Sequence, residues 1–275
     1  MNNYAEIPII NRMTIVLDEI LSSPNGLKAT DILEKIKLPK TTLYRLLQSM
    51  VDNGFIIHHK DTNVYKIGYK FAESYQIVNL KFEKLKDIAR PYLKSLADSV
   101  QETVKLSVLS GMQAFTLISI EGSRPIRINI DTGALFPLNA GASGKILMSS
   151  LSSSEIEYYM QKYAKKYTEN SIITMEGIKQ EFDFINKNRF AKDDGEYLPE
   201  ICAIAVPIYG EGKNIIAAIS VAYPTMNRDI ENMDTMISHT KKTAEIISIL
   251  MQKESASSLP AKLISGSSRI FLRQS

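Results

Sequence analysis

The sequence of 275 residues predicts an α+β fold divided into two domains. Three observations support this prediction. Segments with apolar residues at helical spacing fill the chain up to Gly54, two β-prone runs around a polar turn follow, and strands and helices then alternate unevenly. A chain of this length can also bury two separate hydrophobic cores.

A helix-turn-helix is predicted between Gly26 and Gly54, where two short amphipathic helices surround a tight turn. A preceding helix over residues 9–21 would pack beneath them. In the second helix of the pair, over residues 39–50, Pro39 suits the first helical turn. Its apolar residues recur at helical spacing and form a buried stripe: Leu43, Leu46, Leu47 and Met50.

The opposite face of this second helix carries hydrogen-bonding groups and no acidic residue, so it could enter the major groove of DNA. Its members are Lys40, Thr41, Thr42, Tyr44, Arg45 and Gln48. An ordinary surface helix also has a polar face, so the residues that follow decide between the two interpretations. Two β-prone runs around the polar turn 60–63 predict a hairpin, or wing. Three helices and a wing in this order predict a DNA-binding domain.

Arg45 and Lys40 are the strongest candidates for DNA contacts. Arginine can bind guanine through two hydrogen bonds, whereas a lysine at a helix start more often contacts phosphate. The remaining assignments are weaker: phosphate or base-edge bonds from Thr41, Thr42 and Tyr44, an adenine contact from Gln48, and backbone contacts by the wing residues Lys60 and Lys66. Each of these could instead be a solvated surface group.

Composition sets limits on other functions. No apolar run reaches the ~18 residues of a membrane-spanning helix, and the first residues lack the features of a secretory signal, so we expect a cytoplasmic protein without a membrane partner. The single cysteine, Cys202, excludes an internal disulfide and a cysteine-based zinc site. We expect no metal and no cofactor. Residues 1–70 carry a net charge of +2 and residues 71–254 a net charge of −2, which agrees with DNA binding by the first domain.

The predicted domains are a winged helix-turn-helix over residues 1–70, a linker helix over 71–85, a second domain over 86–254 and a mobile serine-rich tail over 255–275. The helices expected in and before the second domain cover residues 69–80, 87–103, 153–163, 175–188 and 228–251, and residues 141–148 are expected to be a glycine-containing loop that opens a helix. The strands expected there cover residues 104–109, 114–120, 127–130, 203–209 and 215–223.

Seven short motifs, in order and in register, resemble those of the IclR family of bacterial transcription regulators. In the first domain they are Leu38–Leu47, Gly54–Ile56 and Tyr65–Gly68, and in the second Ala142–Lys145, Asp193–Glu196, Ile204–Pro207 and Ala217–Val221. The resemblance covers about residues 10–253. It implies a winged N-terminal domain, a linker helix and a GAF-like effector-binding domain, assembled as dimers or tetramers on an operator.

The resemblance also implies positions for an effector. The backbone amides of Ala142 and Ser143 would hold its carboxylate, Asp193 would make a polar contact, and Ser220 corresponds to the first of two pocket serines. Two positions depart from the family pattern. Ala203 replaces the usual pocket cysteine, with Cys202 expected on the other side of the strand, and Ala222 replaces the second serine. These losses leave room for a larger or less polar effector.

Other chemistry is less well supported. Asp193, Asp194 and Glu196 fit turn-capping carboxylates better than a metal or acid–base site, since no histidine accompanies them, although Asp193 and Glu196 could contact a ligand. Cys202 fits an inert small hydrophobe better than a redox sensor. The glycine spacing of residues 141–144 does not match a phosphate-binding P-loop.

We therefore expect a ligand-responsive regulator that senses a small organic or sugar acid and controls a catabolic operon, with double-stranded DNA and a second copy of the chain as partners. One alternative is a DNA-binding protein whose GAF-like domain only oligomerises, its pocket filled by its own side chains. Another is an enzyme with an accessory winged module. The enzyme alternative lacks a nucleophile with a base, a metal set and a cofactor fingerprint in the sequence.

Overall fold

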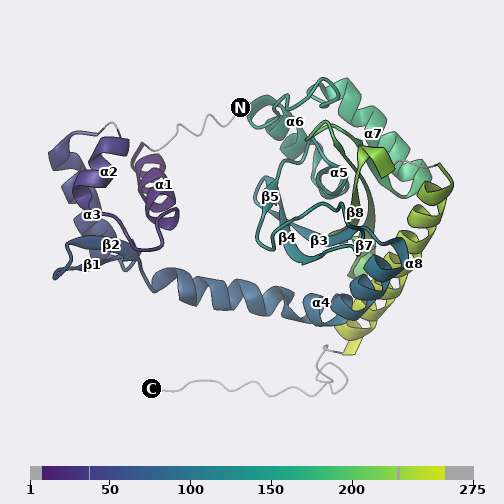
Figure 1. The fold of residues 1–275 in the computed structure, drawn as a ribbon, viewed down its shortest axis with the longest axis horizontal. Coiled ribbons are helices and arrows are strands. Elements are labelled where there is room, and N and C mark those ends of the chain that lie inside the picture. The colour runs from purple at the N-terminus through teal and green to yellow at the C-terminus, as the bar shows by residue number, and fades with distance from the viewer. Residues whose placement is uncertain (1–7, 37, 228–229, 258–275) are drawn as a thin grey trace, which may run out of the picture. The chain divides into compact units, whose positions relative to one another are not determined.

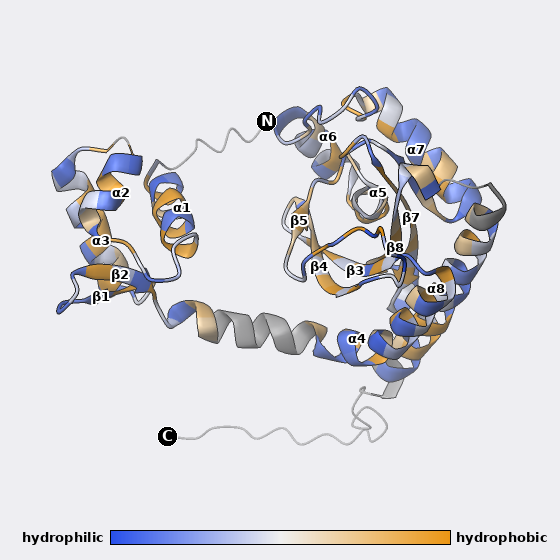
Figure 2. Ribbon diagram, in the orientation of Figure 1, coloured by the Kyte–Doolittle hydropathy of each residue, from blue (hydrophilic) through white to orange (hydrophobic). Residues whose placement is uncertain are grey.

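The computed structural model describes residues 8–36, 38–227 and 230–257. The chain divides into two compact units, one up to Glu83 and one from Lys84 onward, each with its own hydrophobic core. Figure 1 labels the elements of both units, and Figure 2 shows hydrophobic and hydrophilic residues interleaved along their helices. None of the described helices is long and apolar enough to cross a membrane.

The first unit is a three-helix domain with a wing, as predicted. Its elements are α1 (Pro8–Leu21), α2 (Ala29–Lys35), α3 (Lys40–Asp52), β1 (Ile56–His59) and β2 (Val64–Ile67). The predicted stripe of α3 is buried in the core of this unit, together with Val16 of α1 and Ile32 of α2. Helix α3 begins at Lys40 rather than Pro39, because Pro39 has an extended ψ of 138° and occupies the N-cap.

The wing is an antiparallel hairpin that pairs Ile56 with Ile67 and His59 with Val64. Within it, the ring of His58 stacks on Tyr65 at a centroid distance of 4.4 Å. Two backbone hydrogen bonds join Tyr65 to Leu27, before α2, with N···O distances of 2.7 and 3.1 Å. The wing is therefore attached to the helices by backbone pairing as well as by the core.

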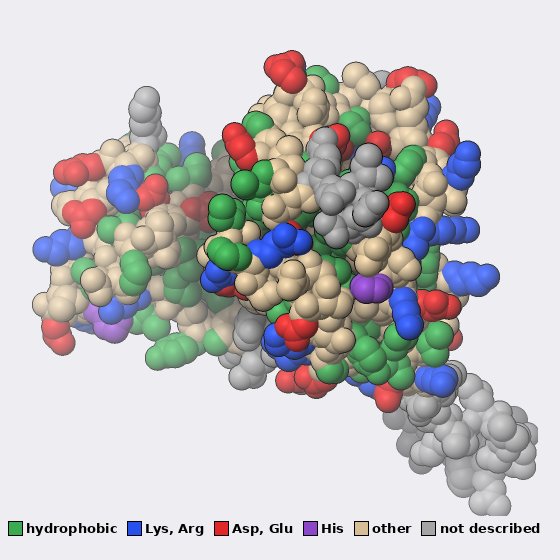
Figure 3. All heavy atoms as spheres, turned by 45° about the vertical axis from the view of Figure 1, so that its right-hand side comes forward, with side chains coloured by type: hydrophobic (Ala, Val, Ile, Leu, Met, Phe, Trp, Pro, Cys, Tyr) green, Lys and Arg blue, Asp and Glu red, His purple; other side chains and the backbone are tan. Residues whose placement is uncertain are grey.

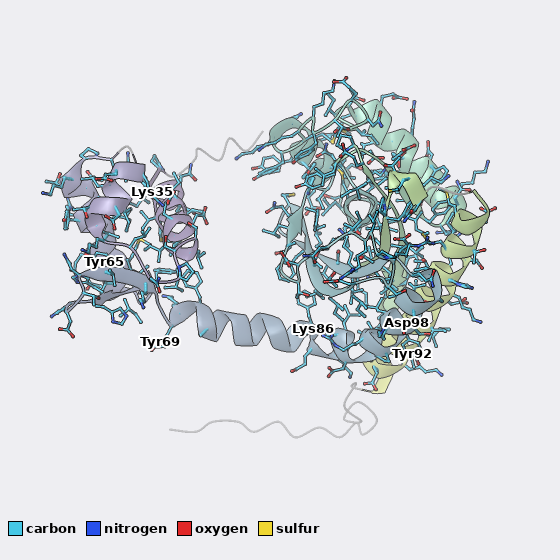
Figure 4. The ribbon with its side chains drawn as sticks, viewed as in Figure 1. Lys35, Tyr65, Tyr69, Lys86, Tyr92 and Asp98 are labelled. Carbon is cyan, nitrogen blue, oxygen red and sulfur yellow. The ribbon has the colours of Figure 1, made fainter. Side chains whose placement is uncertain are left out.

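Helix α4 (Lys70–Val100) replaces the two helices predicted over residues 69–80 and 87–103. The intervening residues 81–86 contain no glycine or proline, so nothing interrupts the helix there. Pro91 lies inside the helix and removes one backbone donor, which this long helix tolerates. Figure 4 marks its second half with Lys86, Tyr92 and Asp98, and the residues of this half that are buried in the second unit are Leu85, Ala89, Leu93, Leu96 and Ala97.

The second unit contains a six-stranded antiparallel sheet in the order β5-β4-β3-β8-β7-β6. Its strands are β3 (Thr103–Ser110), β4 (Gln113–Ile120), β5 (Leu135–Phe136), β6 (Ala191–Asp194), β7 (Ile201–Tyr209) and β8 (Ile215–Pro224), and its helices after α4 are α5 (Ala142–Met148), α6 (Ser153–Lys162), α7 (Met175–Asn188) and α8 (Ile230–Ser257). Helices α5 and α8 both pack on β7 and β8. The strands predicted near 104–109, 114–120, 203–209 and 215–223 are confirmed, as are the helices predicted near 153–163, 175–188 and 228–251. The loop expected to open a helix at 141–148 is itself mostly helix α5.

The two faces of this sheet differ in side-chain size, although both are buried. Cross-strand register places Lys105 beside Ser220, and Ser220 beside Ala205. The face that these residues share is turned toward α5 and is small and partly polar: Thr103, Lys105, Ser107, Asp193, Ala203, Ala205, Ala218, Ser220 and Ala222. Residues on the opposite face are large and apolar: Val104, Leu106, Val108, Ile204, Val206, Ile219 and Val221.

Three predictions for the second unit were wrong. Residues 127–130 form no strand; instead the hydroxyl of Thr103 donates to the carbonyl of Ile128 at 2.6 Å, and the sheet edge is β5. The segment around Asp193, expected as a loop, is β6, which pairs with β7. Residues 255–257, assigned to the tail, continue α8; residues 228–229 and 258–275 lie outside the described residues.

The segment that leads into α5 is held by Tyr159, whose hydroxyl is buried. This hydroxyl accepts from the amides of Leu138 (2.8 Å) and Asn139 (3.3 Å) and donates to the side-chain oxygen of Asn139 at 3.0 Å. Since it satisfies three buried groups, it fixes the approach of the chain to α5.

Replacing Tyr159 by phenylalanine should lower the stability of the second unit by about 1–3 kcal/mol, because buried amides lose their acceptor. Tyr158→Phe is the matched control, since Tyr158 is 45% exposed. Differential scanning calorimetry of the full chain should show a lower melting temperature for Y159F only. Equal melting temperatures for both variants would contradict this assignment.

Candidate functional site

The polar face of α3 is accessible. Lys40, Thr41, Tyr44, Arg45 and Gln48 are exposed and Thr42 is half-buried. The side-chain amide of Gln48 already donates to Asp52 at 2.7 Å within the same helix, so a base contact would have to replace this bond. Lys60 is exposed in the turn of the wing and Lys66 is half-buried on β2. The first unit thus presents each of the eight candidate residues for DNA contact at least partly to solvent.

A cavity of about 110 Å³ lies in the second unit, between the small-residue face of the sheet and the start of α5. Its wall comprises Lys105, Ile128, Asn129, Ile130, Phe136, Ala140–Gly144, Asp193, Tyr197, Leu198, Ile201, Ala203, Ser220 and Ala222. Ala203 and Ala222, which replace the expected cysteine and serine, both border it. The volume is below the roughly 300–1,000 Å³ of sites for drug-sized ligands, which favours a small molecule.

Lys105 is the cavity residue that sequence reasoning missed. It is only 7% exposed, and its ammonium lies 3.6 Å from the centroid of the Phe136 ring. Burial lowers the pKa of Lys105 to about 8, and the charge of Asp193 opposes part of that shift. The available signal was the alternation of Thr103, Lys105 and Ser107 with apolar residues, which places a lysine on one face of a strand.

Two hydroxyl groups at the cavity have no hydrogen-bond partner among the described residues. They belong to Ser143 on α5 and Ser220 on β8, which are 3% and 0% exposed. Buried hydroxyls are normally paired, so an unpaired hydroxyl at a cavity wall is available to a bound ligand or water.

Asp193 both caps a turn and borders the cavity. Its Oδ1 accepts from the amide of Glu196 at 2.8 Å, across a turn in which Gly195 has φ +68°. Its Oδ2 lies 3.7 Å from the position that a Cβ would occupy on Gly141, at the cavity wall. Burial raises the pKa of Asp193, against the opposing effects of the Glu196 amide and the charges of Lys145 and Lys105.

Glu196 does not border the cavity. It accepts from Lys145 Nζ at 2.5 Å and from the amide of Gly141 at 3.3 Å. Lys145 is fully buried and also pairs with Glu181 at 2.8 Å. Burial raises the pKa of Glu196 to about 7, although the charge of Lys145 opposes that shift. This ion cluster, which lies outside the cavity wall, holds the start of α5 in place.

Cys202 lies on the opposite side of β7 from Ala203, as expected. Its thiol is buried near Thr225 (3.7 Å) and Asp194 (3.9 Å), and burial raises its pKa. A thiol with a raised pKa is poorly reactive. Within the described ranges no three metal-binding side chains come together. Figure 3 shows that positive and negative side chains are interspersed on the surface in view.

Comparison with family models identifies both units. Residues 12–58 match the IclR helix-turn-helix domain, and residues 78–249 match the model described as bacterial transcriptional regulator IclR C-terminal. The chain belongs to the IclR family. It is therefore a DNA-binding transcriptional regulator and not an enzyme, and its fold is the winged helix-turn-helix and effector domain of that family.

Comparisons with individual IclR-family members support this assignment. The chain is 28% identical over 208 residues to the transcriptional regulator KipR of Bacillus subtilis, covering 75% of this chain and 82% of that relative. The crystal structure of IclR from Thermotoga maritima matches with a TM-score of 0.64 and 25% identity, covering 90% and 99% of the two chains. An IclR homologue from Microbacterium hydrocarbonoxydans, solved in complex with 4-hydroxybenzoate, matches in fold with a TM-score of 0.66 and 20% identity, covering 88% and 98%.

In this IclR-family protein the buried Glu196 should make stability depend on pH. In the folded chain the pKa of Glu196 is about 7, above its ordinary value of 4.5. As the pH rises from about 4.5 to about 7, Glu196 therefore loses its proton in unfolded chains but keeps it in folded chains. This proton release stabilises the unfolded state, and folding stability contributed by Glu196 falls over that window by on the order of 1–3 kcal/mol.

The measurement is the melting temperature of wild type and Glu196→Gln between pH 4.5 and 8. The melting temperature of wild type minus that of E196Q should decrease as the pH rises to about 7 and should then stay constant. A difference that does not change with pH would show that Glu196 is ionised throughout.

Proposed function

We propose that this IclR-family regulator senses a small organic or sugar acid and controls a catabolic operon. The cavity of the second unit carries this proposal, because it combines the cation of Lys105 with Asp193 and the unpaired hydroxyls of Ser143 and Ser220. A small cavity with a few polar groups is the usual form of a ligand site.

The cavity also weighs against a domain that only oligomerises. In that alternative the protein's own side chains would fill the pocket, whereas about 110 Å³ stays open beside Ala203 and Ala222. The small side chains at these two positions thus leave space for a ligand.

For the effector contacts we propose the backbone of Ala142 and Ser143 and the side chains of Asp193, Ser143 and Ser220, which all border the cavity. Glu196 would act indirectly, through its bonds to Lys145 and Gly141. The ligand of the Microbacterium homologue, 4-hydroxybenzoate, is a small carboxylate and has the chemistry that this cavity favours.

For the DNA contacts we propose the exposed face of α3 and the wing. Arg45 would bind a base edge, Lys40 a phosphate, and Lys60 and Lys66 the backbone beside the wing, with Thr41, Thr42, Tyr44 and Gln48 in supporting contacts. The chain would act as a dimer or tetramer on half-sites about one helical turn apart, or a multiple of it. An effector then shifts DNA affinity only by its preference for one arrangement of the subunits, typically ~1–3 kcal/mol.

Replacing Arg45 by alanine should weaken binding to DNA from upstream of the protein's own coding region by roughly 10- to 100-fold, as expected for loss of a guanine contact. Lys60→Ala should instead lower the slope of log affinity against log salt by about 1. Fluorescence anisotropy gives both values. Lys94→Ala on α4 is the matched control, since Lys94 pairs with Asp98 outside the winged domain. If R45A bound this DNA with wild-type affinity, Arg45 would not be a DNA contact.

The proposed sensing is tested by repeating the wild-type titration with sugar acids and aromatic carboxylates. We expect one class of acid to change operator affinity about 5- to 150-fold without changing binding to random DNA. Operator binding that no acid alters, together with an unchanged melting temperature, would favour the alternative in which the second unit only oligomerises.

A further inference from the structure

We propose that Lys105 selects the effector by binding its carboxylate while Asp193 accepts a hydrogen bond from a hydroxyl group of the same molecule. The effector is then a hydroxycarboxylic acid with a largely apolar body. This inference rests on the proposed sensing function and narrows it to one chemical class.

Among the described residues, Lys105 has no anionic partner in direct contact, and only the more distant charge of Asp193 acts on it. Its ammonium forms no ion pair or hydrogen bond with any described residue and contacts the ring of Phe136. A buried charge without a partner is unfavourable, and the lowered pKa of Lys105 reflects this. A carboxylate in the cavity would give the ammonium a charge-assisted hydrogen bond and relieve this unfavourable burial.

Asp193 also borders the cavity and interacts with Lys105 electrostatically without forming an ion pair. The two residues belong to β3 and β6, which β8 and β7 separate in the sheet. Three strand spacings correspond to roughly 14 Å between the backbones, so the side chains approach one another from different sides of the cavity. A ligand between them meets a donor at one end and an acceptor at the other.

The walls between these two ends are mostly apolar. The apolar side chains are Ile128, Ile130, Phe136, Leu198, Ile201, Ala203 and Ala222, and the other polar side chains are Asn129, Tyr197 and the unpaired hydroxyls of Ser143 and Ser220. A polyhydroxylated sugar acid would leave several hydroxyls without partners against these walls, which is unfavourable. A single hydroxyl group on an apolar body matches the available partners better.

The titratable groups around Lys105 are few. Asp193 on β6 and Tyr197 in the turn after β6 border the same cavity. Helix α5 contributes Ser143, and the Lys145 of this helix is paired with Glu196 and Glu181. The neighbouring positions on β8, β4 and β5 are Ser220, Ser119 and Phe136. Because its pKa is lowered to about 8, Lys105 is a group at the cavity whose charge we expect to change between pH 7 and 9.

The test uses four probes with one skeleton: phenylacetate, its hydroxylated forms mandelate and 4-hydroxyphenylacetate, and the neutral 2-phenylethanol. Isothermal titration of the full-length wild type should give the tightest binding for a hydroxylated acid and the weakest for the alcohol. Lys105→Met should weaken binding of the acids about 10- to 100-fold. Asp193→Ala, which removes both carboxylate oxygens, should abolish the preference for the hydroxylated acid over phenylacetate.

Two further variants separate recognition from general effects. Lys192→Met removes a lysine from the exposed side of β6 and should leave acid binding unchanged. Lys105→Arg keeps the charge, so acid affinity should stay constant between pH 7 and 9, whereas wild-type affinity should fall above about pH 8, where Lys105 loses its proton. Melting curves and operator binding without ligand check that each variant is folded.

Equal acid binding by wild type and K105M would overturn the role of Lys105 while leaving acid sensing intact. Equal binding of phenylacetate and both hydroxylated acids would overturn the role of Asp193. If the wild type binds sugar acids such as gluconate and none of these probes, the apolar class is wrong. If it binds no acid at all, the proposed sensing function fails as well.

Discussion

The sheet of the second unit must bury both of its faces while keeping one of them small and partly polar. Alternation along β3 and β8 places Val104 and Val221 on one side and Lys105 and Ser220 on the other. The large residues fill the core on their own side. The alanines and serines of the other side cannot fill the space beneath α5, so a cavity persists at the point where a lysine and an aspartate are also buried. The proposed ligand cavity thus follows from the same pattern that builds the sheet.

A second buried charge set gives that cavity its rigid border. Lys145 pairs with both Glu196 and Glu181, and Glu196 also accepts from the amide of Gly141, the residue just before α5. Gly141 has φ +95°, a conformation that side chains with a Cβ rarely adopt, and an acceptor on its amide stabilises the turn. Removing one member of such a cluster leaves a buried charge unpaired, which is costly. The lysine of the Ser-Gly-Lys motif therefore supports the site and does not contact the cavity.

Much of the fold could be predicted from sequence because its signals are local. The stripe of α3, the wing turn and the apolar runs of β7 and β8 need no information from distant residues. By contrast, β6 contains the charged residues Lys192, Asp193 and Asp194 and is a strand only through its pairing with β7. Sequence reasoning missed Lys105 because a lysine in an alternating strand is normally solvent-exposed. Here the face of the sheet that carries Lys105 is covered by α5, a helix distant in sequence. The pairing of Glu196 with Lys145 spans 51 residues and has no local signal.

The cavity's role as an acid site is tested most directly by a crystal structure of the full-length protein with its tightest-binding hydroxycarboxylic acid. The carboxylate should lie within hydrogen-bonding distance of Lys105 Nζ, with a hydroxyl group donating to Asp193 and a further contact to Ser220 or Ser143. An acid bound elsewhere, or bound in this cavity with its carboxylate away from Lys105, would contradict this account.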